Sequence, residues 1–384
     1  MKTKKAHLDL QQYGMFVALI AIFLIFNVAT GGNNATPVNM NNLVMQNGYV
    51  VILATGMLLC VLTGNIDLGV GSIVAVTGAV AAILVVDKGA SIPVAFLVAL
   101  LIGLASGAFV GFFVAYIGIP PFVVTLATML MGRGLTYTLL QAQTKGPLPE
   151  NFNKIGAGFL PKIGANLDIL CLVVAAAATV LLVFSELNDI RTKKKYGFET
   201  IPVWQSAVKV IVIAAIIWFF FIKLAQYNGI PMILVLMFVI VAIYHFITSK
   251  TVAGRQIYAL GGNAKAARLS GINTKRVFFW VYTNMGFLAA VAGIVLAARN
   301  ASATPKAGDG FEMDAIASCY IGGAAAAGGV GTIIGAVVGA FIMGILNNGM
   351  SLMGWSTDIQ KIVKGLVLLG AVTFDIVSNR RKGN

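Results

Sequence analysis

The sequence predicts an all-α polytopic membrane protein with about twelve transmembrane segments. Hydrophobic residues make up 59% of its 384 residues and charged residues only 10%. A water-soluble domain of this length could not keep so much apolar surface out of water, so lipid must cover much of it. Apolar runs of about 20 residues, the length of one membrane-crossing helix, recur along the whole chain. No hydrophilic stretch is long enough to form a core of its own, which predicts a single transmembrane domain over residues 1–384.

Ten apolar runs are long enough to cross a membrane as helices. They fall near residues 13–29, 42–64, 92–116, 122–140, 167–184, 206–226, 230–248, 277–298, 329–350 and 358–377. Two further segments, 70–86 and 315–327, are short and rich in Gly and Ala. We expect them to be broken or partial helices inside the bundle, where protein can satisfy unpaired backbone groups. Counting both as crossings gives twelve.

The positions of the basic residues test this count. Such residues in short connectors mark the cytoplasmic side of a membrane protein. Twelve crossings place both termini and all the basic clusters in the cytoplasm, whereas leaving out either short segment moves at least one cluster outside. The net charge of +14 is therefore a topology signal, and nucleic-acid binding is not expected. Sixteen of the 27 Lys and Arg residues form four clusters, which are Lys2, Lys4 and Lys5; Arg191, Lys193, Lys194 and Lys195; Lys250, Arg255, Lys265, Arg268, Lys275 and Arg276; and Arg380, Arg381 and Lys382.

Cysteine and histidine give no sign of a disulfide framework or a metal centre. Cys60, Cys171 and Cys319 are odd in number and lie in apolar runs without a CxxC pair, which predicts buried thiols. His7 and His245 lie far apart in the sequence and belong to no cluster of ligands, so neither a metal site nor a cofactor is predicted.

Two runs carry glycines spaced four residues apart, which puts a strip of bare backbone on one helix face. We favour packing within the chain over a subunit interface as the role of these strips. Because one set occurs in each half of the chain, the pattern also hints at an internal duplication, as in many transporters. The two sets are Gly103, Gly107 and Gly111, and Gly331, Gly335 and Gly339.

No catalytic motif is present, so the chain is not predicted to be an enzyme. It lacks the GxxxxGK[ST] phosphate loop, the nucleophile elbow, HExxH and a paired-carboxylate constellation. All thirteen Asp and Glu residues fall in tails, in loops or within a turn of a predicted helix end. That placement counts against ion-driven transport by this chain alone, because such transport usually needs acidic groups within the spans. Energy for transport then has to come from a partner.

A polar solute needs hydrogen-bonding side chains along its path. We predict that Asn65, Asp67, Asn347 and Asn348 line such a path, since an Asn in a span must be satisfied by water or a neighbouring helix. Asp67 sits at a predicted helix break, where an N-cap is its favoured main role, and a capped break can also form a polar transport site. A neutral, sugar-like solute fits this lining better than an ion.

Arg133, between two glycines inside a predicted span, is the clearest cation at membrane depth. Its side chain is expected either to extend toward the outer surface or to pair with a carbonyl or a carboxylate. The sequence favours neither a structural nor a functional role for it.

Residues 249–276 form the longest polar and basic connector in the chain. Within them, residues 251–276 carry a Gly-Gly-Asn turn, a short Ala-rich stretch predicted to be helical, and five basic side chains. Lipid requires none of this detail, so the segment is typical of a surface that another protein binds.

The stretch GRQIYALGGNAKAARLSGI at 254–272 resembles the cytoplasmic coupling segment of permeases from bacterial ABC importers of monosaccharides, the ribose, xylose and multiple-sugar group. Four other stretches agree with that family in order: LTGNIDLGVGS at 62–72, GIPPFVVTLATMLMGRGL at 118–135, GFEMDAIASCYIGG at 310–323 and GILNNGMSLMG at 344–354. An extra helical hairpin at about 167–226 is more similar to the longer xylose and multiple-sugar permeases. The stretch GGAAAAGGVG at 322–331 departs from the family, which often has hydroxyl side chains there.

The resemblance implies a homodimeric permease of the bacterial inner membrane that moves a pentose or hexose by ATP-driven alternating access. Its implied partners are a cytoplasmic ABC ATPase subunit and a periplasmic sugar-binding protein, which would select the sugar. A permease of an amino-acid ABC importer and an ion-coupled transporter acting alone are the alternatives. The residues that the resemblance implies to dock in the ATPase are Gly261, Gly262, Asn263, Ala266, Ala267, Arg268, Ser270 and Gly271.

Overall fold

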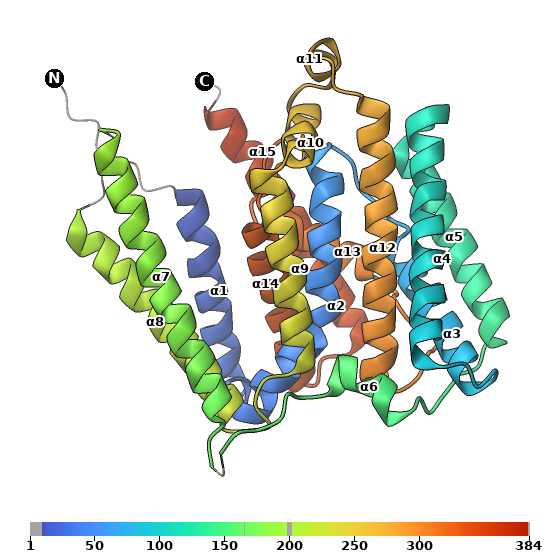
Figure 1. Ribbon diagram of the computed structural model, residues 1–384, viewed down its shortest axis with the longest axis horizontal. Coiled ribbons are helices and arrows are strands. Elements are labelled where there is room, and N and C mark those ends of the chain that lie inside the picture. Colours follow the sequence, from blue (N-terminus) through green and yellow to red (C-terminus); the bar gives the residue numbers. More distant parts are fainter. Residues whose placement is uncertain (1–9, 165, 198–201, 383–384) are drawn as a thin grey trace.

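The computed structural model describes residues 10–164, 166–197 and 202–382. Helices joined by short connectors make up this part of the chain, and it contains no β-strand. Most of the helices run side by side as one bundle (Figure 1). The predicted all-α class is confirmed.

Most of the helical elements follow the predicted apolar runs, whereas η1, α6 and α10 fall on stretches for which no helix was predicted. In chain order they are α1 (Leu10–Ala29), the 3-10 turn η1 (Asn33–Ala35), α2 (Pro37–Leu62), α3 (Val70–Val86), α4 (Ile92–Phe112), the π-helical turn η2 (Phe113–Ile117), α5 (Pro121–Leu140), α6 (Glu150–Ala157), α7 (Ile169–Lys195), α8 (Val203–Ala225), α9 (Met232–Lys250), α10 (Val252–Gly262), α11 (Ala264–Leu269), α12 (Thr274–Asn300), α13 (Phe311–Ile321), α14 (Ile333–Leu352) and α15 (Thr357–Lys382).

Among the described residues, eight helical stretches are long and apolar enough to cross a membrane. They lie on α2, α4 with η2, α5, α7, α8, α9, α12 and α14, and α1 and α3 contribute shorter apolar helices. The two segments predicted to be broken are short: α3 has 17 residues and α13 has 11. Beyond Ile321 the chain leaves the helix and turns before α14, so the predicted segment 315–327 is helical only in its first part.

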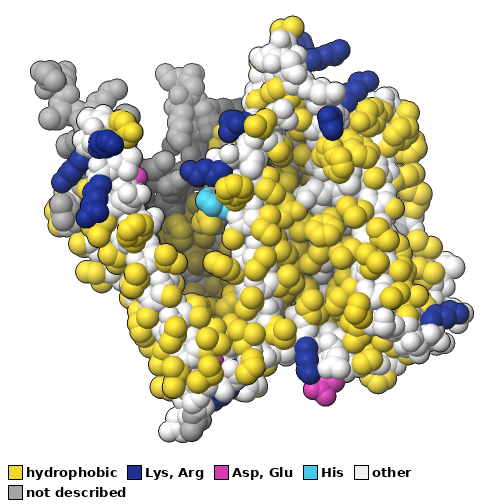
Figure 2. All heavy atoms as spheres, viewed as in Figure 1, with side chains coloured by type: hydrophobic (Ala, Val, Ile, Leu, Met, Phe, Trp, Pro, Cys, Tyr) yellow, Lys and Arg dark blue, Asp and Glu magenta, His cyan; other side chains and the backbone are white. Residues whose placement is uncertain are grey.

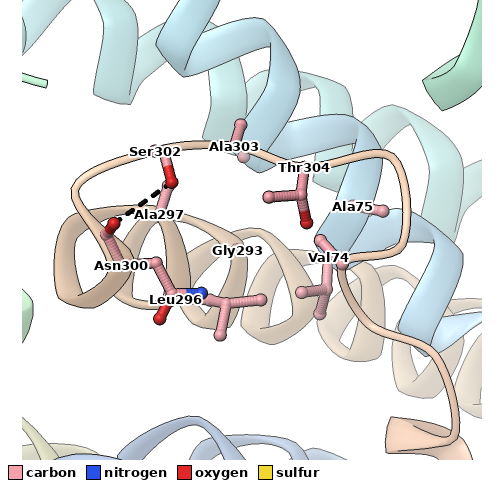
Figure 3. A pocket seen from close by; sticks show the side chains of 11 residues that line it. Val74, Ala75, Gly293, Leu296, Ala297, Asn300, Ser302, Ala303 and Thr304 are labelled. Atoms are coloured by element: carbon pink, nitrogen blue, oxygen red, sulfur yellow. Dashed lines mark hydrogen bonds between the residues drawn. The ribbon is translucent and has the colours of Figure 1, made fainter. Parts of the chain in front are cut away.

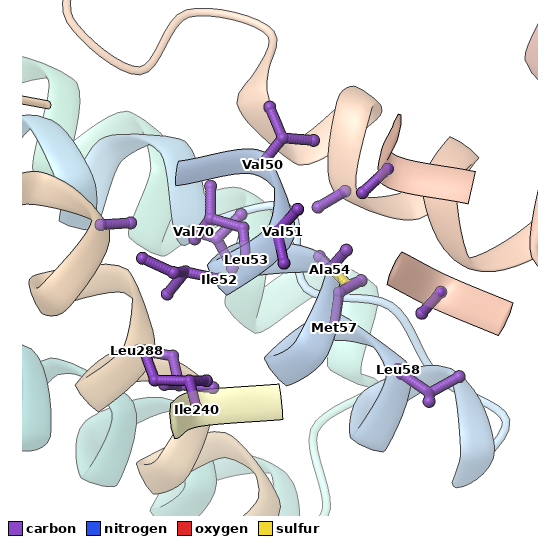
Figure 4. Packing of buried hydrophobic residues seen from close by; sticks show 14 of the residues in the cluster. Val50, Val51, Ile52, Leu53, Ala54, Met57, Leu58, Val70, Ile240 and Leu288 are labelled. Carbon is purple, nitrogen blue, oxygen red and sulfur yellow. The ribbon is translucent and has the colours of Figure 1, made fainter. Parts of the chain in front are cut away.

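The core is built around α2 and α12, because 83% of the apolar window of each is buried. Figure 4 shows successive α2 side chains, from Val50 to Leu58, packing between Val70, Ile240 of α9 and Leu288 of α12. Thr36 caps the start of α2 by accepting a hydrogen bond from the backbone of Asn39 at 3.4 Å, and Pro37 occupies the first helical position.

Two sets of four helices, α2 to α5 and α12 to α15, make corresponding contacts. α3 packs on α5 and α12, and α13 packs on α15 and α2; likewise α4 packs on α12, and α14 packs on α2. In Figure 1, α2 runs toward the edge that carries α10 and α11, whereas α12 runs away from it. The two sets are thus inverted relative to each other, as in transporters built from inverted repeats, which agrees with the duplication hinted at by the glycines.

The glycine strips serve packing within the chain. A Cβ built at Gly103 or Gly107 would overlap backbone carbonyl oxygens of α12, and one at Gly111 would lie 2.7 Å from the carbonyl oxygen of Phe279. Gly335 and Gly339 meet the backbone around the end of α13 in the same way. The first member of the second set does not follow the prediction: Gly331 has φ +149 and lies in the connector before α14, outside the helix.

The extra hairpin at 167–226 is present as α7 and α8, which are the least buried of the eight apolar stretches. Only 11% of the apolar window of α7 and 6% of that of α8 are buried. Buried Asp168 fixes its base, because Asp168 Oδ1 accepts hydrogen bonds from the amides of Ile163 (3.0 Å) and Leu170 (3.1 Å). The basic cluster Arg191–Lys195, predicted to be a loop, lies instead in the last turns of α7, where cations complement the helix dipole.

The α4–α12 contact makes a prediction about stability. Gly107→Ala is expected to lower the unfolding midpoint in detergent, because overpacking costs about 1–3 kcal/mol and exceeds the gain of about 0.5–1 kcal/mol from replacing a helical glycine. Gly14→Ala on α1 is the matched control, since a Cβ there meets nothing within 4 Å. Thermal unfolding followed by size-exclusion chromatography measures both, and equal midpoints for the two variants would contradict this account of the packing.

Candidate functional site

The predicted coupling segment consists of two short helices. Thr251 caps α10 by accepting a hydrogen bond from Gly254 N at 3.3 Å. Asn263 has an extended backbone, ends α10 and caps α11, since its Oδ1 accepts a hydrogen bond from Ala266 N at 3.0 Å. The Gly-Gly-Asn sequence therefore breaks one helix and starts the next. Figure 1 shows α11 as the outermost element at its end of the molecule.

Most residues predicted to dock in a partner are accessible. Ala267 is the exception: it is 5% exposed and faces the protein, so a bulky residue there would disturb the fold before it disturbed any docking. Its neighbour Leu269 is 90% exposed, although the sequence analysis did not select it. The position of Leu269 in the last turn of a six-residue helix, on a face away from Ala267, was the signal that was missed. The exposed residues are Gly262, Asn263, Ala266, Arg268, Ser270 and Gly271, and Gly261 is half-buried.

Close backbone contacts seat α10 on the rest of the protein. A Cβ at Gly261 would overlap the carbonyl oxygen of Leu62 at the end of α2 and lie 2.6 Å from the amide of Gly329. That amide itself donates to the Leu62 carbonyl at 2.9 Å. In addition, Tyr258 OH donates to the carbonyl of Gly331 at 2.7 Å.

α10 therefore touches both the end of α2 and the connector between α13 and α14. The glycine-rich stretch 322–331 lacks the hydroxyls common in the similar family, and its glycines allow this approach. Any displacement of α10 would act directly on the segments that follow α2 and α13, the two places where the bundle is interrupted.

The first interruption lies between α2 and α3. Asp67 is 1% exposed, and its Oδ1 accepts a hydrogen bond from Gly69 N at 2.8 Å, which forms a turn before the helix. The N-cap of α3 is Gly69, without a side-chain cap, so the predicted N-cap role of Asp67 is wrong. Asn65 is half-buried, and its amide donates to the carbonyl oxygen of Thr63 at 3.1 Å. A Cβ at Gly71, in the first turn of α3, would overlap the carbonyl oxygen of Gly308. The start of α3 and the loop before α13 are thus in contact.

Arg133 holds the loop before α13. Its guanidinium donates to the carbonyl oxygens of Ala307 and Gly308 at 2.5 and 2.6 Å, so of the predicted alternatives the structure shows pairing with carbonyls. Glu312, 7% exposed, lies in the same region, and its Oε2 has no hydrogen-bond partner among the described residues.

A second polar group lies where α13, α14 and α15 meet. Lys364 Nζ is 3.0 Å from Asp314 Oδ1, and Asn347 Nδ2 is 3.4 Å from Asp314 Oδ2. Asp314 is 2% exposed, whereas Asn347 is half-buried. We call Asp314, Asn347 and Lys364 the polar triad.

These positions correct one expectation. Asp67, Glu312 and Asp314 lie close to helix ends, as predicted, but those helix ends are themselves buried inside the bundle. The inference that the interior of the bundle holds no acidic group is therefore wrong. Distance from the end of an apolar run did not reveal burial, because the broken helices start within the protein.

Asn348, predicted to line the path, has no free polar group in this conformation. It is 4% exposed, and its amide exchanges hydrogen bonds with that of Asn39 at 2.9 and 3.0 Å. Its Nδ2 also donates to Gln46 Oε1 at 3.2 Å. Asn348 thus ties α14 to α2, while Asn347 is the member of the pair that stays partly accessible.

A small pocket lies between α3, α12 and the connector that follows α12 (Figure 3). Val74, Ala75, Gly293 and Leu296 line it on the helices, and Ser302 to Thr304 cover it from the connector. It has room for about one water molecule, which excludes a sugar-sized ligand in this conformation.

Interrupted helices, buried polar groups at the interruptions and an exposed, separately folded helical segment together define a multi-pass membrane permease. The chain belongs to the family described as "Branched-chain amino acid transport system / permease component", whose profile matches residues 39–372.

Curated relatives share nearly the whole length of the chain. It is 38% identical to the xylose transport system permease protein of Escherichia coli K12, over 97% of this chain and 94% of the relative. It is 35% identical to the ribose import permease protein of the same organism, over 95% and 94%, and 32% identical to that of Bacillus subtilis 168, over 97% and 95%. No solved structure matches the chain.

The close contacts of α10 with the end of α2 predict how well residues 251–276 resist protease. Gly261→Ala is expected to lift α10 from the end of α2 and to make residues 251–276 more sensitive to protease, because the new Cβ has no space. The adjacent Gly262→Ala is the matched control, since a Cβ there meets nothing within 4 Å. Limited proteolysis in detergent compares the two, and the same resistance in both variants would show that α10 is not seated by these contacts.

Proposed function

We propose that the protein is the transmembrane subunit of a binding-protein-dependent ABC importer, and that it moves a pentose or hexose across the bacterial inner membrane. The observation that carries this proposal is the exposed α10–α11 segment seated on both helix interruptions. Relatives named as xylose and ribose permeases over nearly their whole length support a monosaccharide as the solute. The polar groups at the interruptions match such a solute, since a monosaccharide offers only hydroxyl and ether oxygens.

The α10–α11 side is the cytoplasmic side in this proposal. The described basic residues of the second and third clusters lie at the end of α7, at the end of α9, on α10 and α11, and at the start of α12. In Figure 1 these positions share one edge of the bundle, and Figure 2 shows Lys and Arg side chains gathered there. The positive-inside rule assigns that edge to the cytoplasm. α1 begins and α15 ends toward the same edge, in keeping with twelve crossings and two cytoplasmic termini.

The ATPase partner would bind the exposed surface of α11 and the turn before it. Gly262, Asn263, Ala266, Arg268, Ser270 and Gly271 remain the proposed contacts, with Leu269 added. An exposed leucine beside cationic side chains suits an apolar pocket with an acidic rim, and buried anchors of this kind dominate binding energy at interfaces. Gly261 and Ala267 would act indirectly, by seating the segment on the protein.

Alternating access would follow from the contacts of α10 with the end of α2 and with the connector between α13 and α14. When the ATPase closes on ATP, α11 and α10 would move together, and the contacts of Gly261 and Tyr258 would carry that motion to the end of α2 and to the 322–332 connector. Both interruptions would then change position at once. Packed interfaces of this kind switch between discrete arrangements instead of deforming continuously.

A second copy of the chain would complete the permease, and α15 supports this. Its outward face exposes Ile362 (65%), Leu366 (64%) and Leu369 (65%), while the side chain of Lys361 on the same helix is 61% exposed. A cation and its Asp309 partner facing lipid would be costly. A homodimer whose subunits meet along α15 would cover the apolar residues and leave the charges beside a water-lined path.

The direct test is co-purification from native membranes in mild detergent, followed by ATP hydrolysis with periplasmic extract and xylose, ribose or leucine. An ATPase is expected to co-elute, and a binding protein loaded with one of the sugars is expected to raise its turnover. Stimulation by leucine alone would make the protein an amino-acid permease, as the family description allows. Elution without an ATPase, with uptake driven by an ion gradient, would replace the proposal with an ion-coupled transporter.

A substitution tests the docking surface. Gly262→Trp is expected to abolish ATPase co-purification and sugar uptake, because a Cβ at that position meets nothing within 4 Å, so the bulky side chain would extend away from the chain and block the partner. Monodisperse elution and an unchanged unfolding midpoint check that the protein is folded. Lys154→Trp on α6, at the opposite edge, is the control and should retain the ATPase. Wild-type uptake by the Gly262 variant would remove α10–α11 from the coupling role.

A further inference from the structure

The polar triad is unusual because its three members come from three helices and lie amid apolar side chains. Lys364 Nζ is within 3.0 Å of one carboxylate oxygen of Asp314 and 3.1 Å of the other, and Asn347 approaches the same carboxylate at 3.4 Å. A buried ion pair contributes little net stability once the desolvation of both charges is counted, and apolar residues of the same size would hold the helices as well. Helix packing alone therefore does not account for the triad.

The triad also has unused hydrogen-bonding capacity. Asn347 Oδ1 is buried and has no hydrogen-bond partner among the described residues. An ammonium carries three donors, and both recorded contacts of Lys364 go to the one carboxylate. These groups lie close to the surface, since the Lys364 side chain is 23% exposed and Asn347 is half-buried. A small solute that reached them would meet an amide oxygen, an ammonium and a carboxylate together.

The chemistry of this set favours a neutral polyol. A carboxylate only accepts hydrogen bonds and an ammonium only donates them, while an amide does both; a hydroxyl both donates and accepts, so adjacent hydroxyls of one ring can use all three groups. The charges of Asp314 and Lys364 cancel, so the triad gives no net attraction to a charged solute. Phe311, one helical turn before Asp314, stacks on Tyr49 with ring centroids 4.1 Å apart and supplies the apolar wall that small-molecule sites usually have.

The location suits the first contact with a delivered solute. α13 and α15 both begin toward the edge opposite α10 and α11, the side that the proposed function assigns to the periplasm (Figure 1). The triad lies within the first two or three turns of those two helices, since Asp314 is the fourth residue of α13 and Lys364 the eighth of α15.

We propose that Asp314, Asn347 and Lys364 form the monosaccharide-binding site of the permease on its periplasmic side. The Asp314–Lys364 pair closes on itself when the site is empty and exchanges part of its contacts for sugar hydroxyls when the site is filled. This inference rests on the proposed function and adds residues to it.

The first test is the double substitution Asp314→Asn with Lys364→Gln, which removes both charges, leaves no unpaired charge and preserves side-chain size. In proteoliposomes that hold permease and ATPase, uptake of xylose or ribose from the loaded binding protein is expected to fall about tenfold or more, the loss that goes with one or two buried hydrogen bonds. Stimulation of ATP hydrolysis by the loaded binding protein should be retained. Asp87→Asn with Lys145→Gln neutralises another ion pair (2.9 Å) on the same side and should transport normally.

The outcomes separate the two proposals. Lower uptake with ATPase stimulation retained supports the site. Normal uptake by the Asp314/Lys364 variant, or a fall in unfolding midpoint with normal uptake per folded complex, makes the pair a structural clasp and overturns the site. Absence of stimulation by any sugar-loaded binding protein in the wild type would instead contradict the importer function itself.

A second measurement does not depend on the double variant folding. Cys60, Cys171 and Cys319 are all 0% exposed, so the wild-type chain offers no accessible thiol among its own cysteines. Asn347→Cys introduces one, and its reaction with a methanethiosulfonate reagent is expected to slow severalfold when xylose or ribose is delivered by the binding protein. Ser91→Cys, exposed on the same side between α3 and α4, is the control and should react at one rate throughout. Equal rates at Asn347→Cys with and without sugar would overturn the site.

Discussion

The constraint on which this structure depends is that irregular backbone cannot face lipid. Each unpaired N–H or C=O group in the hydrocarbon region costs several kcal/mol, so the interruptions after α2 and after α13 must be enclosed by protein. α2 and α12 are the most buried of the eight apolar stretches, and the guanidinium of Arg133 donates to two carbonyls of the loop before α13. Because protein encloses these interruptions, Asp67, Glu312 and Asp314 can be buried inside an otherwise apolar bundle.

Glycines allow the close backbone contacts that enclose the interruptions. They lie both between helices that stay together and where α10 meets the bundle. Where helices are to remain together, as α4 with α12, the glycines lie in regular helix and bring two backbones into contact. Where α10 meets the bundle, Gly261 contacts the end of α2 and Gly329 lies in a bend with φ +74. The first kind of contact is long and repeated, whereas the second joins short segments at single points. A displacement of α10 would therefore shift the interruptions more readily than the helices that surround them.

The sequence predicted much of the fold because long apolar runs have only one stable form in a membrane. The limits of α3 match residues 70–86, whereas the N-cap predicted at Asp67 lies at Gly69, because Asp67 bonds to the amide of Gly69 in the turn before the helix. The inward face of Ala267 and the bonding of Asn348 to Asn39 could not be predicted in the same way. Each depends on which side of a helix meets a segment far away in the chain, and neither Ala nor Asn has a periodic pattern that reveals its partner. Of the polar triad, the sequence predicted only Asn347, as an amide in a span. Asp314 was interpreted as an acid near a helix end, and no pattern pointed to Lys364.

The charges on α13 and α15 connect the fold to a path for a solute. A lipid-facing helix would not carry Lys361, with its side chain 61% exposed, one turn from Lys364, and would not leave Asp309 59% exposed beside it. A fully enclosed helix would not expose Ile362, Leu366 and Leu369. A face that combines both kinds of residue is satisfied only when another protein surface covers the apolar part and water reaches the charged part. Lys364 of the polar triad lies one turn from Lys361 on α15, so in the proposed permease a solute that enters beside these charges would pass close to the triad.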